Sequence, residues 1–447
     1  MNPVTIRPST AELVGALKEA RARTLELVED LGHEQMMGPR LSIVNPVLWE
    51  TGHVAWFQEY WVLRHARGHE PIIEHGDALY DSARVGHDTR WDIPLPSREE
   101  TLAYMQSVLD RVAEGISATP GEPGRYDETY FLYLTLFHEC MHAEAITYTR
   151  QTLGYPPPRI TVADAEDGKA APPGASPGIE GDARIPGGEV MLGSAKESPF
   201  AFDNEQWEHA VEVLPFSIAR AAVTNAEFAA FVDDRGYERR EFWSEEGWHW
   251  RERAGAGRPV YWERFSNEGW ARRHFDRVIP LEDRLPVIHV NWHEASAYCL
   301  WAGRRLPTEA EWEAAASAEP SADGRALSGL KRPYPWGDEF PSRERANLDW
   351  RAMNVVDVAA LPEGDSAFGC RQMIGNVWEW TSTDFNPFPG FGAGPYREYS
   401  EPWFGDHKVL RGGCWATRSS LIRNQFRNFY KPDRRDVLAG FRTCAIP

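Results

Sequence analysis

Residues 126–158 read YDETYFLYLTLFHECMHAEAITYTRQTLGYPPP and predict a long helix that ends at Gly154. Glycine commonly ends a helix, and the prolines at 156–158 cannot continue one. Inside this helix His138 and His142 stand four residues apart, so both imidazoles lie on one face. That is the geometry two ligands of one cation need, although two ordinary polar or core histidines would show the same spacing.

Three further helices are expected before this one. Ser9–Glu12 is a capping-box pattern and opens a run of leucines at helical spacing up to Leu31. Asn45-Pro46 is expected to be an N-cap followed by proline at the first helical position, and Ser97-x-x-Glu100 caps a third segment that runs to Ile116. Residues 1–154 therefore predict a four-helix bundle with a long, candidate functional connection at 66–96.

His53 strengthens the case for a metal site in this bundle. It lies on the helix that Asn45-Pro46 opens, which would pack beside the helix of His138 and His142. Three neutral imidazoles from two facing helices would leave coordination positions open to water, substrate or oxygen. The chemistry of these side chains does not choose between zinc and iron.

After the bundle the composition and the hydrophobic pattern of the sequence change. Residues 155–184 are rich in Pro, Gly, Ala and Asp and are expected to form a linker. Residues 185–447 have short apolar runs with frequent glycine and tryptophan, which predicts an irregular α+β domain. Brief helices are expected there at 225–233, 292–302 and 308–316.

Composition narrows the classes of function. The 447 residues carry a net charge of −19, which argues against nucleic-acid or anionic-membrane binding. No apolar run reaches the roughly 18–20 residues of a membrane span, and the N-terminal residues do not resemble a secretory signal. The five cysteines are widely spaced without a C-x-x-C pair. We expect a cytoplasmic protein without a disulfide framework.

Two family resemblances together cover almost the whole chain. GHVAWFQE (52–59) followed by HECMHAE (138–144) resembles the DinB-type four-helix bundle. The C-terminal region resembles the formylglycine-generating-enzyme fold, an irregular α/β domain related to C-type lectins. Its matching phrases are LPV (285–287), VNW (290–292), RLPTEAEWE (305–313), PWG (335–337), GNVWEWT (375–381), RGG (411–413) and GFR (440–442).

This pair of domains resembles the ergothioneine sulfoxide synthases. In that family non-haem iron(II) and O₂ join a sulfur donor to the imidazole C2 of hercynine, the trimethylated betaine of histidine. The resemblance implies Fe(II) held by His53, His138 and His142, and a substrate site between the two domains. Formylglycine-generating activity is not expected, because Thr417 and Ile422 stand where those enzymes carry two copper-binding cysteines.

RNFYKPDRR (427–435) is similar to the family segment that lines the substrate pocket. The resemblance assigns Asn428 and Phe429 to hercynine and Arg434 to an acidic group of the donor. Met141 replaces a glutamine that contacts hercynine in the family. Trp415 is a candidate, with Phe429, for cation–π contact with the quaternary ammonium of hercynine.

The donor side departs from the family pattern. Tyr430 replaces the aspartate that meets the amino group of γ-glutamylcysteine, and Phe391 stands where an acid tyrosine is expected. The acid is then Tyr396 or another group, for which Tyr80 in the long connection is our candidate; a buried loop anchor is the alternative role for Tyr80. Arg90, nearby in sequence, is a candidate for holding a carboxylate, or is simply solvated.

These departures favour the selenoneine synthase branch, which takes a selenosugar and forms a carbon–selenium bond. An ergothioneine synthase using cysteine or γ-glutamylcysteine is the alternative reading. A metal-dependent thiol S-transferase would explain the three histidines but would leave the C-terminal domain without a role. A further alternative makes the C-terminal domain a ligand-binding module and the metal of the bundle structural. The partners we expect are hercynine, the donor and O₂.

Overall fold

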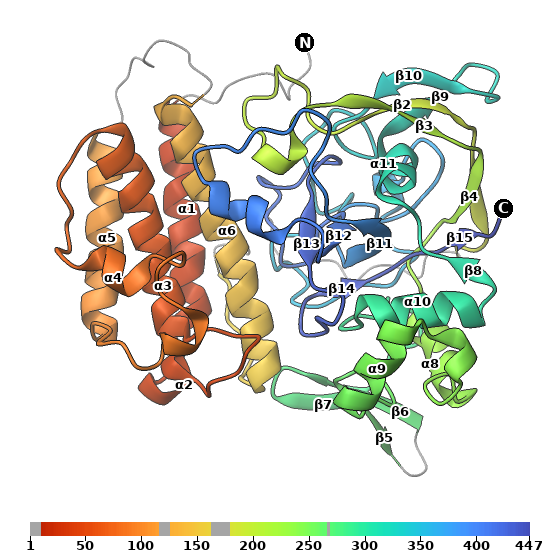
Figure 1. Ribbon diagram of the computed structural model, residues 1–447, viewed down its shortest axis with the longest axis horizontal. Coiled ribbons are helices and arrows are strands. Elements are labelled where there is room, and N and C mark those ends of the chain that lie inside the picture. The colour runs from red at the N-terminus through yellow and green to blue at the C-terminus, as the bar shows by residue number, and fades with distance from the viewer. Residues whose placement is uncertain (1–9, 116–125, 162–178, 266–268) are drawn as a thin grey trace. The chain divides into compact units, whose positions relative to one another are not determined.

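The computed structural model describes residues 10–115, 126–161, 179–265 and 269–447 (Figure 1). They form two compact units, one made by the described residues up to 161 and the other by those from 179 onward. Ser9 of the predicted capping box, Ile116 and most of the predicted linker 155–184 lie outside the described residues. Within the described ranges, no helix has both the length and the hydropathy of a membrane span.

The first unit is the predicted bundle. Helix α3 packs against α5 and α6, and α1 packs against the same two helices, so the four close around one core (Figure 1). Helix α3 continues directly into a π-helical segment, η2, before the long connection begins. The bounds are α1 Thr10–Val28, α2 His33–Met37, α3 Val47–Gln58, η2 Glu59–Ala66, α5 Arg98–Glu114 and α6 Glu128–Leu153.

Two helix ends form as the local sequence predicts, and one does not. Ser97 and Glu100 form the predicted capping box, and Gly154 ends α6 in the left-handed region at φ 67°. Asn45, by contrast, does not cap α3, because Pro46 occupies the cap position and the helix begins at Val47. The amide of Asn45 instead donates to Glu50 Oε1 at 2.9 Å.

The long 66–96 connection contains two short helices, α4 (Gly76–Tyr80) and η3 (His87–Thr89). Tyr80 is fully buried, and its ring fills the space above Gly52 of α3. A Cβ at residue 52 would lie 2.2 Å from Tyr80 Cε1, so this close approach requires glycine. The connection is therefore packed onto the helix that carries His53.

The second unit is the predicted irregular α+β domain, built on two four-stranded sheets. One has the order β1-β4-β15-β8 and the other β13-β12-β11-β14. Their bounds are β1 Asp182–Ile185, β4 Phe216–Ala219, β15 Cys444–Ala445, β8 Arg304–Arg305, β13 Asn428–Tyr430, β12 Lys408–Arg411, β11 Trp378–Asp384 and β14 Ala439–Gly440. In the second sheet, Val409 of β12 pairs with Phe429 of β13, which places residues 428–430 on its outer strand.

Smaller sheets and short helices complete this unit. The sheets are β2 Gly188–Leu192 with β3 His209–Val213, β9 Ala318–Pro320 with β10 Leu327–Lys331, and β5 Trp262–Phe265, β6 Gly269–His274 and β7 Arg277–Pro280. The α-helices are α8 Asn225–Asp233, α9 Glu245–Ala254, α10 Trp292–Trp301 and α11 Glu309–Ser317. The three predicted helices are confirmed. Helix α9 was not predicted, because it buries only Gly247 and Trp250 and so lacks an apolar stripe.

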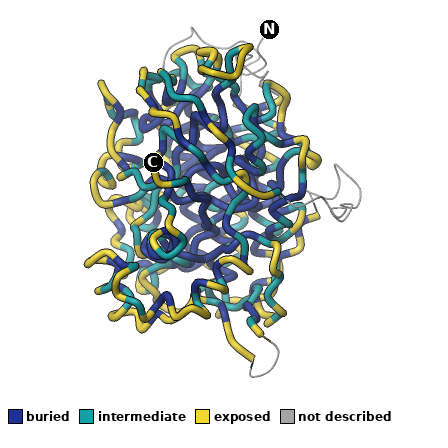
Figure 2. The backbone as a smooth tube through the Cα atoms, turned by 90° about the vertical axis from the view of Figure 1, so that its right-hand side faces the viewer, coloured by how far each residue is buried: buried dark blue, intermediate teal, exposed yellow. Residues whose placement is uncertain are grey.

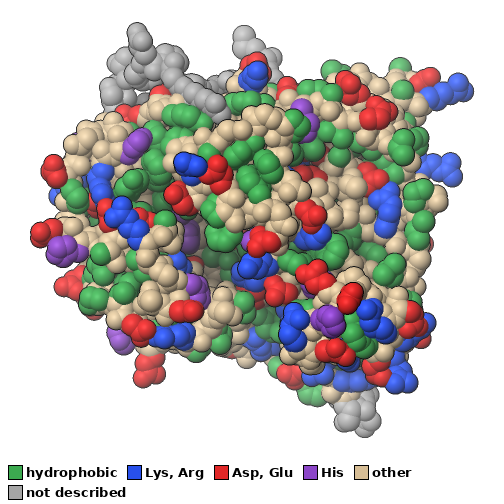
Figure 3. All heavy atoms as spheres, viewed as in Figure 1, with side chains coloured by type: hydrophobic (Ala, Val, Ile, Leu, Met, Phe, Trp, Pro, Cys, Tyr) green, Lys and Arg blue, Asp and Glu red, His purple; other side chains and the backbone are tan. Residues whose placement is uncertain are grey.

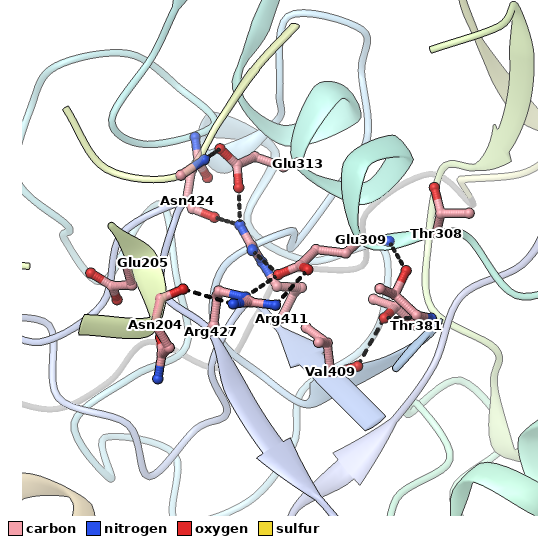
Figure 4. A network of polar contacts seen from close by, with 12 residues as sticks. Asn204, Glu205, Thr308, Glu309, Glu313, Thr381, Val409, Arg411, Asn424 and Arg427 are labelled. Carbon is pink, nitrogen blue, oxygen red and sulfur yellow. Dashed lines mark hydrogen bonds and ion pairs between the residues drawn. The ribbon is translucent and has the colours of Figure 1, made fainter. Parts of the chain in front are cut away.

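A buried ionic network ties α11 to strands β12 and β13 (Figure 4). Glu309 accepts from Arg411 at 2.7 Å and from both Nε and Nη2 of Arg427, at 2.7 and 3.0 Å. Arg411 also pairs with Glu313. Since Arg427 directly precedes Asn428, this network fixes the start of the segment to which substrate contacts were assigned from the sequence.

The inner turns of the C-terminal unit are buried, whereas its outermost loops are exposed (Figure 2). Lys and Arg side chains are interspersed with Asp and Glu over the face seen in Figure 3.

Candidate metal centre

The bundle brings together the three histidines that the sequence singled out. His53 comes from α3, and His138 and His142 come from α6. One ligand nitrogen from each lies within 4.8 Å of the other two. The Nε2 atoms of His53 and His138 are 3.2 Å apart, close to the roughly 3 Å that separates two neighbouring ligands with metal–nitrogen bonds of about 2.1 Å.

The tautomer of His53 is set by the long connection. Its Nδ1 lies 2.7 Å from the carbonyl oxygen of Tyr80 and donates its proton there. Nε2 therefore carries the lone pair that a metal needs, and it faces His138. The indole of Trp49 stacks on the His53 ring at 4.7 Å, which holds the ring in this orientation.

The site keeps its buried histidines neutral. Burial lowers the pKa of His53 and of His138 well below the usual 6.5, and the neighbouring His142 adds to the shift. The phenyl ring of Phe57 stacks on His138 at 3.6 Å, which gives that imidazole an apolar wall. The His142 side chain is 20 % exposed, so one side of the cluster is open. Three imidazole groups whose ligand nitrogens lie this close together fit a divalent metal ion.

Tyr80 serves this site through its backbone. Its hydroxyl lies beside Thr101 of α5, while its carbonyl holds His53. Burial raises the pKa of Tyr80 to about 12, with the Thr101 hydroxyl acting in the opposite direction. This geometry supports the loop-anchor role, and the use of its hydroxyl as an acid stays a prediction.

Arg90 is neither solvated nor at the surface. Its guanidinium lies 3.8 Å above the Trp49 ring, and Nη1 donates to Asn45 Oδ1 at 2.6 Å. Met141 is half-buried on α6, directly before His142. Arg90 and Met141 thus belong to the same unit as the histidine cluster.

The other predicted substrate residues belong to the C-terminal unit. Phe429 stacks on Phe385 at 3.9 Å and meets the ring of Tyr399 at 5.7 Å. Asn428 Oδ1 accepts from the backbone N–H of Phe429 at 2.8 Å. Trp415 is buried, with its ring 6.5 Å from Phe275.

Arg434 is already engaged within this segment. It forms a two-pronged ion pair with Asp436, at 2.7 and 2.6 Å, and its guanidinium lies 5.3 Å from the Tyr430 ring. The charge that the sequence assigned to a donor carboxylate is therefore matched by a carboxylate of the protein itself.

Comparison with known proteins agrees with this two-part architecture. Residues 16–146 match the DinB superfamily, and residues 170–446 match the sulfatase-modifying factor enzyme 1-like domain family. The chain is 37% identical over 444 residues to the hercynine oxygenase of Mycolicibacterium thermoresistibile, covering 97% of this chain and 95% of that protein. It is 36% identical to the hercynine oxygenase of Mycolicibacterium smegmatis, covering 96% and 97%. The chain belongs to the hercynine oxygenase family.

Membership of the hercynine oxygenase family confirms the prediction of an oxidoreductase. The formylglycine-generating enzyme of Streptomyces coelicolor is 35% identical over 309 residues, which cover 63% of this chain and 93% of that protein. This similarity covers a smaller share of the chain than the similarity to the hercynine oxygenases, as expected if only the C-terminal domain is shared.

Two residues of this hercynine oxygenase family member stand out only in three dimensions. Glu50 lies beside His142, with Oε1 3.7 Å from Nδ1. Tyr399, on η7 (Arg397–Tyr399), touches Phe429, whereas Tyr396 is the tyrosine of that loop that the sequence made a candidate. Glu50 lies one helical turn before His53, but this spacing does not indicate its contact with His142 on α6, and nothing local marks Tyr399.

Proposed function

We propose that the protein is an iron-dependent hercynine oxygenase that joins the sulfur of a thiol donor, cysteine or γ-glutamylcysteine, to the imidazole C2 of hercynine. The observation that carries the proposal is the three-histidine cluster, found in a chain that aligns with hercynine oxygenases over nearly its whole length. A thiol S-transferase would use the histidines but would leave the C-terminal domain without a role.

In this proposal His53, His138 and His142 would hold iron(II), which would supply the redox chemistry with O₂. The Tyr80 carbonyl orients His53, and the rings of Trp49 and Phe57 keep water from the buried side of the cluster. Confining the reactants in this way aligns the reacting atoms and limits side reactions.

Substrate contacts follow the family assignment. Asn428, Phe429, Trp415 and Met141 would meet hercynine, while Arg90, Tyr430 and Arg434 would lie on the donor side. A tyrosine hydroxyl would deliver a proton during the reaction. The candidates are Tyr80, Tyr396 and Tyr399, of which Tyr399 has the geometric support of its contact with Phe429.

One observation favours a second candidate, in which the donor is a selenosugar and the new bond is carbon–selenium. Asp436 pairs with Arg434, and Tyr430 is uncharged, so these two positions offer little net charge to an amino-acid donor. A sugar lacks those charges and would suit such a pocket.

The test is to mix anaerobically iron-loaded protein with hercynine and one donor at a time, then admit air. Mass spectrometry follows the product and an electrode follows oxygen. A hercynine–sulfur adduct from cysteine or γ-glutamylcysteine supports the main proposal, and a selenium adduct formed only from the selenosugar supports the second. No adduct and no oxygen uptake with any donor would overturn both.

A further inference from the structure

Glu50 is a buried carboxylate placed against one of the three histidines. It lies on α3, one helical turn before His53, and is 2 % exposed. Its Oε1 accepts from the Asn45 amide at 2.9 Å and lies 3.7 Å from Nδ1 of His142. Burying a carboxylate is unfavourable unless hydrogen bonds satisfy it, so its few partners carry information.

Within the described part of the chain, Glu50 and His142 each keep one polar atom without a partner, although Oε1, the Glu50 oxygen nearest to His142, already accepts from Asn45. Among the described residues, neither Glu50 Oε2 nor His142 Nδ1 has a hydrogen bond, and both atoms are buried. His142 Nδ1 can donate, and the nearest acceptor of the Glu50 carboxylate, Oε1, lies 3.7 Å away and can accept a second hydrogen bond. A shift of under about 1 Å would bring them within the usual limit near 3 Å. Unpaired buried polar atoms of this kind are rare in native proteins.

Glu50 is in turn held from the long connection. Asn45, which bonds Glu50, accepts from Arg90 Nη1 at 2.6 Å, and Arg90 Nη2 donates to the Val85 carbonyl at 3.3 Å. The same connection supplies the Tyr80 carbonyl that orients His53. Two of the three histidines thus have an outer partner that the 76–90 segment provides or secures.

We infer that Glu50 is a positioning residue for His142: its carboxylate accepts the Nδ1 proton, so that Nε2 is presented to the metal. The inference rests on the metal site of the proposed function. Outer-sphere carboxylates of this kind fix the tautomer and ring orientation of ligating histidines, and their loss commonly weakens metal binding about 10–100-fold.

The experiment compares metal affinity in four full-length proteins: wild type, Glu50→Leu, Glu50→Gln and Glu59→Leu. Glu59 is the matched control, because it is equally buried nearby on η2 but bonds Tyr104 and the Ile72 backbone instead of a histidine. Fe(II) and Co(II) are titrated anaerobically against a chelator, and circular dichroism reports folding of each apo protein.

We expect Glu50→Leu to bind metal about 10–100-fold more weakly, Glu50→Gln to recover part of the loss because it keeps an acceptor, and Glu59→Leu to bind as wild type does. Wild-type affinity in a folded Glu50→Leu protein would overturn the inference. His142→Ala distinguishes failure of this inference from failure of the proposed function. If His142→Ala also binds metal with wild-type affinity, the proposed metal site itself is wrong.

A second measurement needs no variant of Glu50. In the Co(II)-loaded wild-type protein, proton NMR resolves the shifted, exchangeable N–H protons of ligating histidines. We expect a slowly exchanging proton from His142, assigned by its loss in His142→Ala, in addition to that of His53. Absence of any such proton from His142 would overturn the inference even if Glu50→Leu failed to fold.

Discussion

His142 is the ligand whose removal separates a catalytic metal from a structural one. Its side chain is the most accessible of the three histidines, since His53 and His138 are buried and His142 is only half-buried. We expect His142→Ala to fold with a melting temperature close to that of the wild-type apo protein, yet to lose oxygen uptake and more than 100-fold in metal affinity, beyond the effect of an outer partner. Unfolding of this variant would instead indicate a structural metal.

Gly52 and Gly15 offer opposite outcomes for the same substitution in two helices. A methyl group at Gly52 would meet the Tyr80 ring at 2.2 Å, whereas nothing lies within 4 Å of one at Gly15. We expect Gly52→Ala to lower the free energy of unfolding by about 1–3 kcal/mol. Gly15→Ala should raise it by about 0.5–1 kcal/mol.

Urea denaturation measures both glycine variants, and metal titration adds a second test. Displacement of Tyr80 would move the carbonyl that orients His53, so Gly52→Ala should also weaken metal binding, while Gly15→Ala should not. Equal stability changes in the two variants would contradict the close packing of the connection on α3.

At the scale of elements, strand β13 depends on the buried network around Glu309. The guanidinium groups of Arg411 and Arg427 both form ion pairs with this one carboxylate, and all three side chains are buried. Glu309→Gln leaves a buried positive charge uncompensated, for which we expect a loss of about 3–5 kcal/mol in the free energy of unfolding. The exposed pair of Arg397 and Glu401 is the control, since Glu401→Gln should cost less than about 1 kcal/mol.

Urea denaturation followed by tryptophan fluorescence compares the variants at Glu309 and Glu401. If the two cost the same, the network is not what holds β12 and β13 to α11. Because Arg427 precedes Asn428, Glu309→Gln should also raise the KM for hercynine under the proposed function.

At the scale of the whole molecule, stability depends on pH through buried histidines outside the metal centre. Burial, with Arg272 adding to it, lowers the pKa of His289 to about 3 and that of His274 to about 4, from the usual 6.5. Below pH 6.5 the unfolded chain takes up these protons and the folded chain does not. Stability from these groups is therefore full above pH 6.5 and falls with decreasing pH, by up to about 1.4 kcal/mol per unit for each histidine.

Glu205 opposes this trend, because burial raises its pKa to about 7 and so favours the folded state at lower pH. The contribution of His289 is therefore measured as the difference in the free energy of unfolding between wild type and His289→Gln. We expect the variant to lose stability less steeply between pH 6.5 and pH 4, measured as the urea midpoint at each pH. Parallel curves would show that His289 is protonated in the folded protein.

The sequence by itself determined what is local. The i, i+4 spacing of His138 and His142, the Ser97 cap and the Gly154 stop act within one or two helical turns, so pattern and propensity sufficed. The tertiary structure alone decided the outer partners: the Tyr80 carbonyl on His53, Glu50 beside His142, and Asp436 on Arg434. Any residue can offer a backbone carbonyl, so the residue type at a position does not reveal this contact. The partner of a carboxylate is set only when packing excludes water and leaves one charge or proton nearest to it.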